Sequence, residues 1–252
     1  MKRNLNEAIG SLVHAKDGNI GRIIDFLFDD HKWTIRYLVV ETVGWQAWHK
    51  VLLSPHAILK HDWESREITV NLTKEQVRNS PDMHTAKTVS REYEAELHHY
   101  YSWPLYWGTA GLYGVGVPLT DYVPASLIRM NESGERISSY KPKGDPNLRS
   151  ILETTGYKAL ADNKDIGQVE SFFADDETWV ISYMLIDSMK LMPGKKILIS
   201  PHWISDVSWF DSEVYIDLTV RAIKDCPEFD YLTAINPDYE TKICDYYSSA
   251  QE

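Results

Sequence analysis

Apolar and polar residues alternate along several short stretches of the chain, which is the pattern of half-buried β-strands. In residues 33–41 every second residue is large and apolar, so these side chains share one face of an extended segment. The apolar set is Trp33, Ile35, Tyr37 and Val39. Polar turns separate the stretches, and Asp17-Gly18 favours a tight hairpin because this pair readily adopts left-handed dihedrals. The strands predicted in this part are residues 11–15, 20–28, 33–41, 50–53 and 68–72.

Helix-capping patterns follow the strands. Thr73 and Gln76 have the spacing of a capping box, in which each side chain binds the other residue's backbone, so a short helix is predicted here. Asn favours the N-cap of a helix and Pro its first position, so Asn236-Pro237 predicts another helix start. The later predicted helices are therefore residues 92–100, capped by Ser90, and a helix that begins after Asn236.

The sequence repeats itself. Residues Gly10 to Ser102 align without a gap to Gly156 to Ser248, at a constant offset of 146 residues. Identical pairs include Gly21/Gly167, Phe26/Phe172, Asp29/Asp175, Trp33/Trp179, Tyr37/Tyr183, Ser54/Ser200, Pro55/Pro201, His56/His202, Trp63/Trp209 and Tyr101/Tyr247. One register held over so many Trp, Pro and Gly positions indicates two copies of one module.

Several short strands per copy predict an all-β fold made of two tandem small β-barrels or sandwiches, each with a short C-terminal helical tail. The expected domains are a first module at residues 1–103 and a second at residues 147–252. Residues 104–146 hold 5 of the 11 prolines and 6 of the 13 glycines, which is the composition of a linker.

Three segments of each copy resemble the PRC-barrel family. In the first copy they are Asp17-Gly18-x-Ile20-Gly21-x-Ile23, Asp29-Asp30-x-x-Trp33-x-Ile35-x-Tyr37 and Lys50-Val51-Leu52-Leu53-Ser54-Pro55, and the second copy repeats them. The family includes the cytoplasmic domain of the photosynthetic reaction-centre H subunit and the barrel of the ribosome maturation factor RimM. Residues 91–104 look like the tail of bacterial two-copy members. The resemblance implies a small β-barrel used for assembly or adaptor work, without shared catalytic residues.

Charge and cysteine content narrow the possible functions. The formal net charge of -11 argues against a nucleic-acid partner, because such proteins neutralise phosphates with Lys and Arg. With 43% hydrophobic residues the chain can bury an ordinary core. Only Cys226 and Cys244 are present, too few for a secreted disulfide framework, and no apolar segment of a signal peptide follows the N-terminal basic residues. We therefore expect a cytoplasmic protein.

Candidate catalytic and metal-binding residues are each better explained by local structure. His56 and His202 follow Ser-Pro, where a histidine is expected to cap or bind a turn. The adjacent pair His98-His99 is predicted to lie on a solvated helix surface. The carboxylate pairs Asp29-Asp30 and Asp175-Asp176 lie between strands and are expected to form turns. We expect no enzyme activity, no catalytic residue, no cofactor and no metal.

One segment stands apart, because residues 100–120 carry no charge and are rich in aromatic side chains. Its prolines and glycines make it a poor membrane helix, so peripheral membrane contact is the most that it predicts. The alternatives are packing on the chain's own barrels and contact with a protein partner or a second copy. We predict an interface between the two barrels, or between two chains, formed by Tyr100, Tyr101, Trp103, Tyr106 and Trp107.

These observations favour a non-catalytic scaffold or adaptor protein that binds a protein partner or itself. Two alternatives stay open at this point. The H-subunit resemblance implies an accessory of photosynthetic or other membrane electron transfer, and a barrel mouth is a place where a small molecule could bind. The sequence identifies neither a partner nor a ligand.

Overall fold

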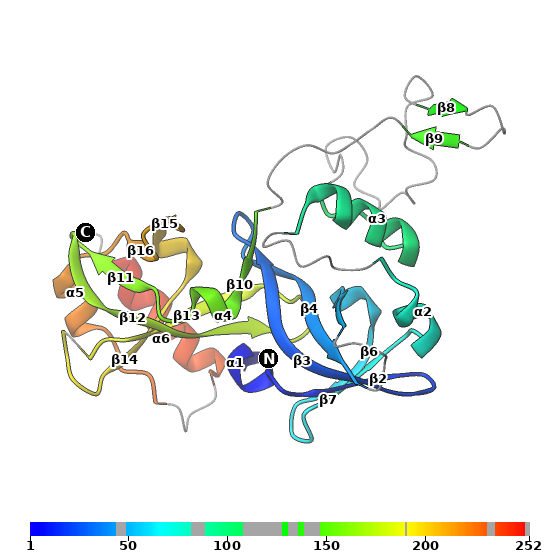
Figure 1. Ribbon diagram of the computed structural model, residues 1–252. Helices are drawn as coiled ribbons and strands as arrows, with labels where there is room; N and C mark the ends of the chain where they lie inside the picture. Colours follow the sequence, from blue (N-terminus) through cyan, green and yellow to red (C-terminus); the bar gives the residue numbers. More distant parts are fainter. Residues whose placement is uncertain are drawn as a thin grey trace.

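The computed structural model describes residues 1–43, 49–81, 89–107, 128–130, 136–138, 147–189, 191–230 and 235–249. In these residues the chain is mainly β and forms two seven-stranded sheets that lie side by side (Figure 1). A separate two-stranded sheet pairs β8 (Ile128–Met130) with β9 (Arg136–Ser138). Residues 108–120, the second half of the uncharged segment, lie outside the described part.

The first copy, residues 10–102, contains one sheet and two helices. Its strands are β2 (Leu12–Ala15), β3 (Gly18–Asp29), β4 (Thr34–Thr42), β5 (Lys50–Leu53), β6 (Ile58–Asp62) and β7 (Glu67–Val70). They pair in the order β5-β4-β3-β2-β7-β6, with β2 and β7 parallel. A short 3-10 helix η1 (Pro55–Ala57) joins β5 to β6, and helices α2 (Lys74–Arg78) and α3 (Arg91–Tyr101) follow the sheet.

The second copy, residues 156–248, has the same elements at the same offset. They are β11 (Lys158–Ala161), β12 (Lys164–Asp175), β13 (Ile181–Asp187), β14 (Lys196–Ile199), η4 (Pro201–Trp203), β15 (Ile204–Ser208), β16 (Glu213–Ile216), α5 (Val220–Asp225) and α6 (Pro237–Ser249). The strand order β14-β13-β12-β11-β16-β15 matches that of the first copy. The prediction that both copies share one fold is confirmed.

The predicted helix caps are also present. Thr73 and Gln76 form both bonds of the capping box at α2, and Ser90 accepts the backbone N–H of Tyr93 at the start of α3. Asn236 accepts the backbone N–H of Tyr239 at 2.8 Å before α6. The two sheets do not close into barrels among the described residues, because no pairing joins the end strands β5 and β6 or β14 and β15. The 3-10 helices η1 and η4 carry the chain between these strands without pairing them.

The two copies exchange short strands. Strand β1 (Lys2–Asn4) precedes the first copy but pairs antiparallel with β12 of the second, at residues 173–175. Strand β10 (Leu148–Ser150) precedes the second copy but pairs with β3 of the first, at residues 27–29. Both pairings are related by the offset of 146, so the exchange is reciprocal and extends the repeat toward the N-terminus.

Backbone hydrogen bonds between the copies follow the same symmetry. The N–H of Ile35 donates to the carbonyl of Trp179 at 2.8 Å, and the N–H of Ile181 donates to the carbonyl of Trp33 at 2.7 Å. Between these bonds lies an isolated bridge from Thr34 to Val180, which are themselves counterparts in the repeat. The copies therefore meet as the two halves of a two-fold symmetric dimer do, with each surface facing its own counterpart.

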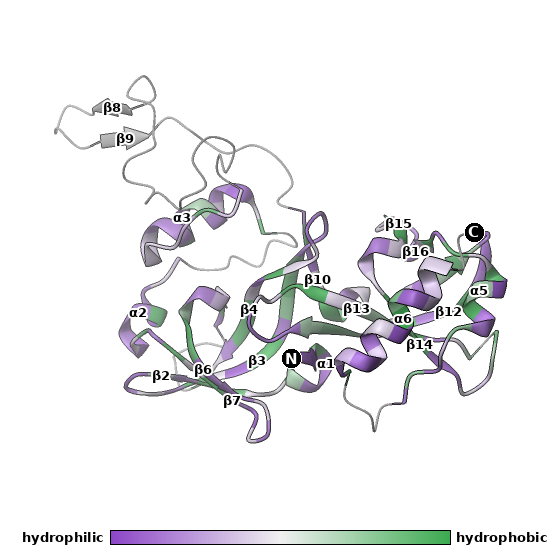
Figure 2. Ribbon diagram, turned by 180° about the vertical axis from the view of Figure 1, so that it is seen from behind, coloured by the Kyte–Doolittle hydropathy of each residue, from purple (hydrophilic) through white to green (hydrophobic). Residues whose placement is uncertain are grey.

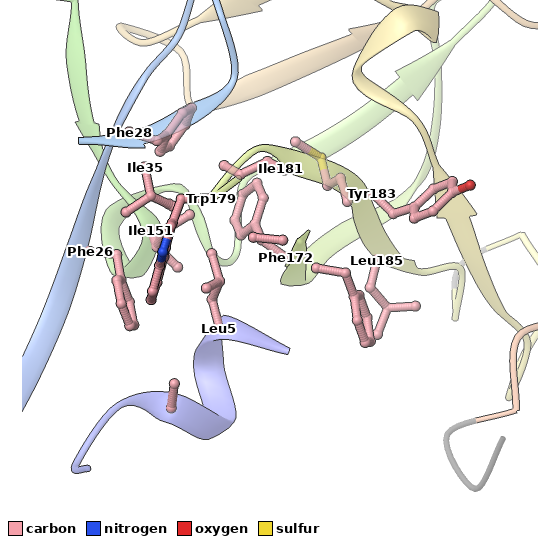
Figure 3. Close-up of a cluster of buried hydrophobic side chains, with 14 of the residues drawn as sticks. Leu5, Phe26, Phe28, Ile35, Ile151, Phe172, Trp179, Ile181, Tyr183 and Leu185 are labelled. Carbon is pink, nitrogen blue, oxygen red and sulfur yellow. The ribbon is translucent and has the colours of Figure 1, made fainter. Parts of the chain in front are cut away.

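One hydrophobic core runs through both copies. Leu5 of helix α1 (Leu5–Ala8) and its counterpart Ile151 of helix α4 (Ile151–Thr154) are both fully buried where the copies meet. Figure 3 shows them in one cluster with Phe26 and Phe28 of the first copy and with Phe172 of the second. Hydrophobic residues run along β4 and β13, whereas α3 is mostly hydrophilic (Figure 2). Burial across the junction therefore joins the two sheets into one body.

An ion pair reinforces each exchanged strand. Arg149 Nε lies 3.0 Å from Asp30 Oδ2, and the Arg149 guanidinium stacks 4.6 Å from the ring centre of Trp209. The counterpart Arg3 Nε lies 3.1 Å from Asp176 Oδ2. Each arginine thus binds a carboxylate of the turn that follows the strand with which its own strand pairs.

We expect Arg149→Ala to lower the free energy of unfolding by about 2–3 kcal/mol. It removes a largely buried ion pair and a cation–π contact, and it leaves the carboxylate of Asp30 without its arginine. Urea denaturation followed by circular dichroism measures the change. Arg221→Ala is the control, since the Arg221 side chain is 94% exposed and its loss should cost under about 0.5 kcal/mol. Equal losses in the two variants would contradict a stabilising role for the Arg149 pair.

Candidate functional site

A pocket of about 440 Å³ lies at the junction of the two copies. The first copy supplies most of its wall, from β4, η1, β6 and the residues that follow α3, and the second copy supplies the turn at residues 176–179. Its polar and aromatic lining includes Arg36, His56, His61, His98, Tyr106 and Trp179. The pocket is therefore a product of the duplication and does not belong to either copy alone.

The histidine at the rim is positioned by the Ser-Pro turn. Ser54 Oγ accepts the backbone N–H of His56 at 3.3 Å and caps η1, so the serine and not the histidine provides the capping side chain. The second copy repeats this bond between Ser200 and His202. The imidazole of His56 is left exposed at the pocket. The expectation of a turn is confirmed, and the role of the histidine in it is corrected to a backbone donor.

The two aspartates of each carboxylate pair bind different partners. Asp29 Oδ1 accepts the backbone N–H groups of His31 and Lys32, and its Oδ2 binds Arg36 at 3.1 Å. Asp175 makes the same turn in the second copy, and backbone hydrogen bonds, chiefly from Thr178, lower its pKa. The prediction that the pairs form turns is confirmed, because Asp29 and Asp175 bind the turn backbone and Asp30 and Asp176 are turn residues. The side chains of Asp30 and Asp176 also bind the arginines of the exchanged strands.

A buried polar cluster lies behind the pocket wall, and it corrects the prediction for His98-His99. His99 is exposed, but His98 of the same helix is only 2% exposed and lies against β4 and the residues after α3. Its Nε2 is 2.6 Å from the Tyr37 hydroxyl, and its Nδ1 is 2.9 Å from the carbonyl oxygen of Pro104. The two rings do point apart, as adjacent positions on a helix require, and this is why one of them enters the core.

Glu94 is the acidic member of the cluster and is completely buried. Its Oε1 accepts the hydroxyls of Tyr106 at 2.6 Å and Tyr37 at 2.9 Å, and its Oε2 lies 2.9 Å from Arg91 Nη1. Burial raises the pKa of Glu94 to about 7, although the hydroxyl donors and Arg91 favour the charged form. The same loss of solvent lowers the pKa of His98 to about 4.

Aromatic and cationic side chains close the cluster from outside. The Arg36 guanidinium lies 4.0 Å from the ring centre of Tyr106, and Arg91 lies 4.5 Å from that of Trp107. His98 meets the rings of Trp103 and Trp107 edge to face. Both ring nitrogens of His98 and the hydroxyl of Tyr106 already have partners within the cluster, so none of them is directed at a reactant in the pocket.

The predicted interface residues pack on the first copy. Tyr101 and Trp103 stack at 4.3 Å between ring centres, and Tyr106 joins the Glu94 cluster. Tyr100 is 39% exposed and donates its hydroxyl to the carbonyl of Gln76. The ring contacts described for Tyr100, Tyr101, Trp103, Tyr106 and Trp107 all lie within the first copy, and Tyr106 also borders the pocket. Their role between copies or between chains stays a prediction.

The second copy keeps part of this arrangement. Tyr183 and Glu240 are the counterparts of Tyr37 and Glu94, while Cys244 replaces His98. Burial, reinforced by Glu240, raises the pKa of Tyr183. The ring centres of Trp203 and Tyr247 lie 6.0 Å apart. Tyr247 is the counterpart of Tyr101, so Trp203 packs on it as Trp103 packs on Tyr101 in the first copy. A tryptophan of the 3-10 helix η4 thus takes the place of the one that follows α3 in the first copy.

Other candidate chemistry can be placed as well. Cys226 is buried, which raises the pKa of its thiol, and Cys244 is exposed; both are free. In the described ranges no three His, Cys, Asp or Glu side chains converge as metal ligands. No helix within those ranges has the length and apolar character needed to cross a bilayer.

Comparison with known proteins adds no relative to these observations. No family model matches the chain, and no curated protein matches it significantly. The PRC-barrel resemblance therefore rests on the residue patterns of the two copies alone and stays a prediction.

Proposed function

We propose that this protein is a non-catalytic adaptor that presents two PRC-barrel-like copies, locked together as one body, to a protein partner. The observation that carries the proposal is the reciprocal strand exchange, which fixes the copies through β1, β10 and a shared core. An adaptor needs such fixed geometry between its surfaces. The side chains with potential chemistry serve this geometry, since Asp30 and Asp176 bind the exchanged strands.

The pocket at the junction is the surface that we assign to the partner. Leu59 stands at its rim with 60% of its surface exposed, and Val180, next to the lining residue Trp179, is 39% exposed. Apolar side chains beside a concave, partly aromatic surface are typical of sites that receive an apolar side chain of a partner protein. The proposed contact spans both copies, so it requires them to be held in register.

Native mass spectrometry of the protein isolated from its own host tests the proposal. We expect a stable complex with the unmodified protein and at least a tenfold loss of the partner with Leu59→Glu, which places a charge at the apolar rim. Phe210→Glu is the matched control, because Phe210 is 97% exposed and does not line the pocket. Retention of the same partner by Leu59→Glu, or its equal loss from both variants, would exclude the pocket as the partner site.

A second candidate function, binding of a small molecule, is favoured by the pocket itself. Its volume of about 440 Å³ is in the range of ligand sites, and Arg36, His56 and His61 line one side. A thermal-shift screen with small carboxylic acids separates the two functions. A stabilising compound whose effect disappears in His61→Ala would favour ligand binding over the adaptor.

A further inference from the structure

The Tyr37 hydroxyl has one proton but lies within hydrogen-bond distance of two possible acceptors. Its single hydroxyl proton faces two groups, Glu94 Oε1 at 2.9 Å and His98 Nε2 at 2.6 Å. The other nitrogen of His98 faces the carbonyl oxygen of Pro104, which can only accept, so Nδ1 must carry a proton. In a neutral His98 the Nε2 atom is then an acceptor. With an ionised Glu94, one hydroxyl proton would have to satisfy two acceptors.

One additional proton resolves the conflict in either of two ways. If Glu94 is protonated, it donates to the Tyr37 oxygen, and Tyr37 donates to His98 Nε2. If His98 carries the proton instead, Nε2–H donates to Tyr37, and Tyr37 donates to the Glu94 carboxylate. The two forms differ only by the movement of two protons along the same pair of hydrogen bonds, and in both forms each contact between these three side chains contains one hydrogen.

We propose that Glu94, Tyr37 and His98 share one proton, and that losing it as the pH rises weakens the docking of helix α3 on the first copy. Without the proton, one of the two short contacts of the Tyr37 oxygen, to Glu94 Oε1 or to His98 Nε2, has no hydrogen in it, and two facing lone pairs in a buried cluster disfavour the packed state. Because His98, Pro104 and Tyr106 line the pocket, the same proton controls one wall of it. The inference concerns α3 and holds whether or not the pocket binds a partner.

Charged and titratable groups of α3, β4, η1 and the residues after α3 face the cluster. Arg91 of α3 lies 2.9 Å from Glu94, and Arg36 of β4 stacks on Tyr106, so both favour the carboxylate. His56, at η1, disfavours a positive charge on His98. Tyr106, from the residues after α3, stays protonated because burial, and then the charge of Glu94, raises its pKa. Burial outweighs the two arginines at Glu94 and keeps its pKa near 7.

The direction of the pH effect follows from the protons bound in each state. In the docked state the pKa of Glu94 is about 7 and that of His98 about 4, against ordinary values of 4.5 and 6.5 once α3 undocks. From pH 4.5 to 6.5 both states hold one proton, so docking is unchanged. Above pH 6.5 the undocked state loses its proton first. Half a pKa unit then makes undocking about twofold more frequent at pH 8 than at pH 6.

Glu94→Gln reverses this dependence. The amide replaces the protonated carboxyl as a donor to Tyr37, and His98 becomes the only titrating member, with a docked pKa below its undocked value. Protonation of the undocked histidine then favours undocking at low pH. We expect undocking to become about fourfold less frequent from pH 6 to pH 8, opposite in sign to the unmodified protein.

Hydrogen–deuterium exchange of the α3 amides at pH 6, 7 and 8, corrected for the intrinsic exchange rate, measures undocking in the full chain. Glu96→Gln is the control, because Glu96 is exposed on the same helix and its loss should leave the unmodified pH dependence in place. The same pH dependence in Glu94→Gln and the unmodified protein would overturn the proposal. So would an NMR titration of the unmodified protein in which His98 has an ordinary pKa near 6.5, a result that needs no variant.

Discussion

Gly167→Ala is expected to lower the free energy of unfolding by about 3 kcal/mol or more. A Cβ at this position would lie 2.0 Å from the backbone carbonyl oxygen of Asp187, at the end of the neighbouring strand β13. A backbone atom held in a sheet cannot rotate away as a side chain can. The residue also has φ +144°, a conformation that side chains disfavour. Both effects act on β12, the strand that receives β1.

Two further glycine variants separate the causes. Gly156→Ala has φ +94° but no atom within 4 Å of the new Cβ, so it should cost only about 1 kcal/mol for backbone strain. Gly21→Ala, the counterpart in the first copy, places a Cβ 1.9 Å from the Glu41 carbonyl oxygen and should resemble Gly167→Ala. Guanidinium denaturation ranks the three variants. A Gly167→Ala loss no larger than that of Gly156→Ala would show that the sheet yields at this contact.

Trp179→Ala is expected to cost about 3–5 kcal/mol, the range for removal of a large buried aromatic side chain. Trp179 is 7% exposed and lies where the two copies meet, with ring centres 6.3 Å from Phe26 and 6.2 Å from Trp63 of the first copy. Its removal leaves a cavity in the shared core, so both copies should lose stability together. The measurement is equilibrium denaturation followed by circular dichroism.

The symmetry of the molecule supplies the comparison for this variant. Trp33 is the counterpart of Trp179 but is only partly buried, so Trp33→Ala should cost less. Phe210→Ala removes an aromatic ring that is 97% exposed and should change stability by less than about 0.5 kcal/mol. Trp179→Ala with a loss as small as that of Phe210→Ala would mean that the copies do not depend on a common core.

Most of the fold within each copy could be predicted because its signals are local. Alternating side chains, the Asp-Gly turn and helix caps each act over a few residues, and the offset of 146 residues transfers them to the second copy. The strand exchange could not be predicted in this way. Residues 2–9 and 148–155 are too short and too different to extend the alignment, with Arg3/Arg149 and Glu7/Glu153 as their identical pairs. Pairing with the distant copy is set by the sheet edges, which local patterns do not reveal.

The candidate site shows the same limit. The turn role of Asp29 follows from neighbouring backbone groups, but the partners of Asp30 and Asp176 come from strands more than 100 residues away. For His98 a signal was present, because Glu94, Leu97, His98 and Tyr101 follow the spacing of one helix face. Leu97 on that face indicates burial. The polar residues beside it conceal the signal, since charged side chains are rarely buried unless they are paired.

The exchange of β1 and β10 has a consequence for synthesis on the ribosome. Residues 2–4 leave the ribosome about 170 residues before their partners at 173–175, which is roughly 10–35 s at about 5–20 residues per second. Until residues 148–150 are made, the nascent first copy exposes the edge of β3 at residues 27–29, where β10 will pair. An unpaired edge recruits other strands, including those of neighbouring nascent chains on the same messenger RNA. Nascent chains are therefore most prone to aggregate with one another before residue 150 is synthesised. A chaperone that covers the edge of β3 would have its largest effect during that time.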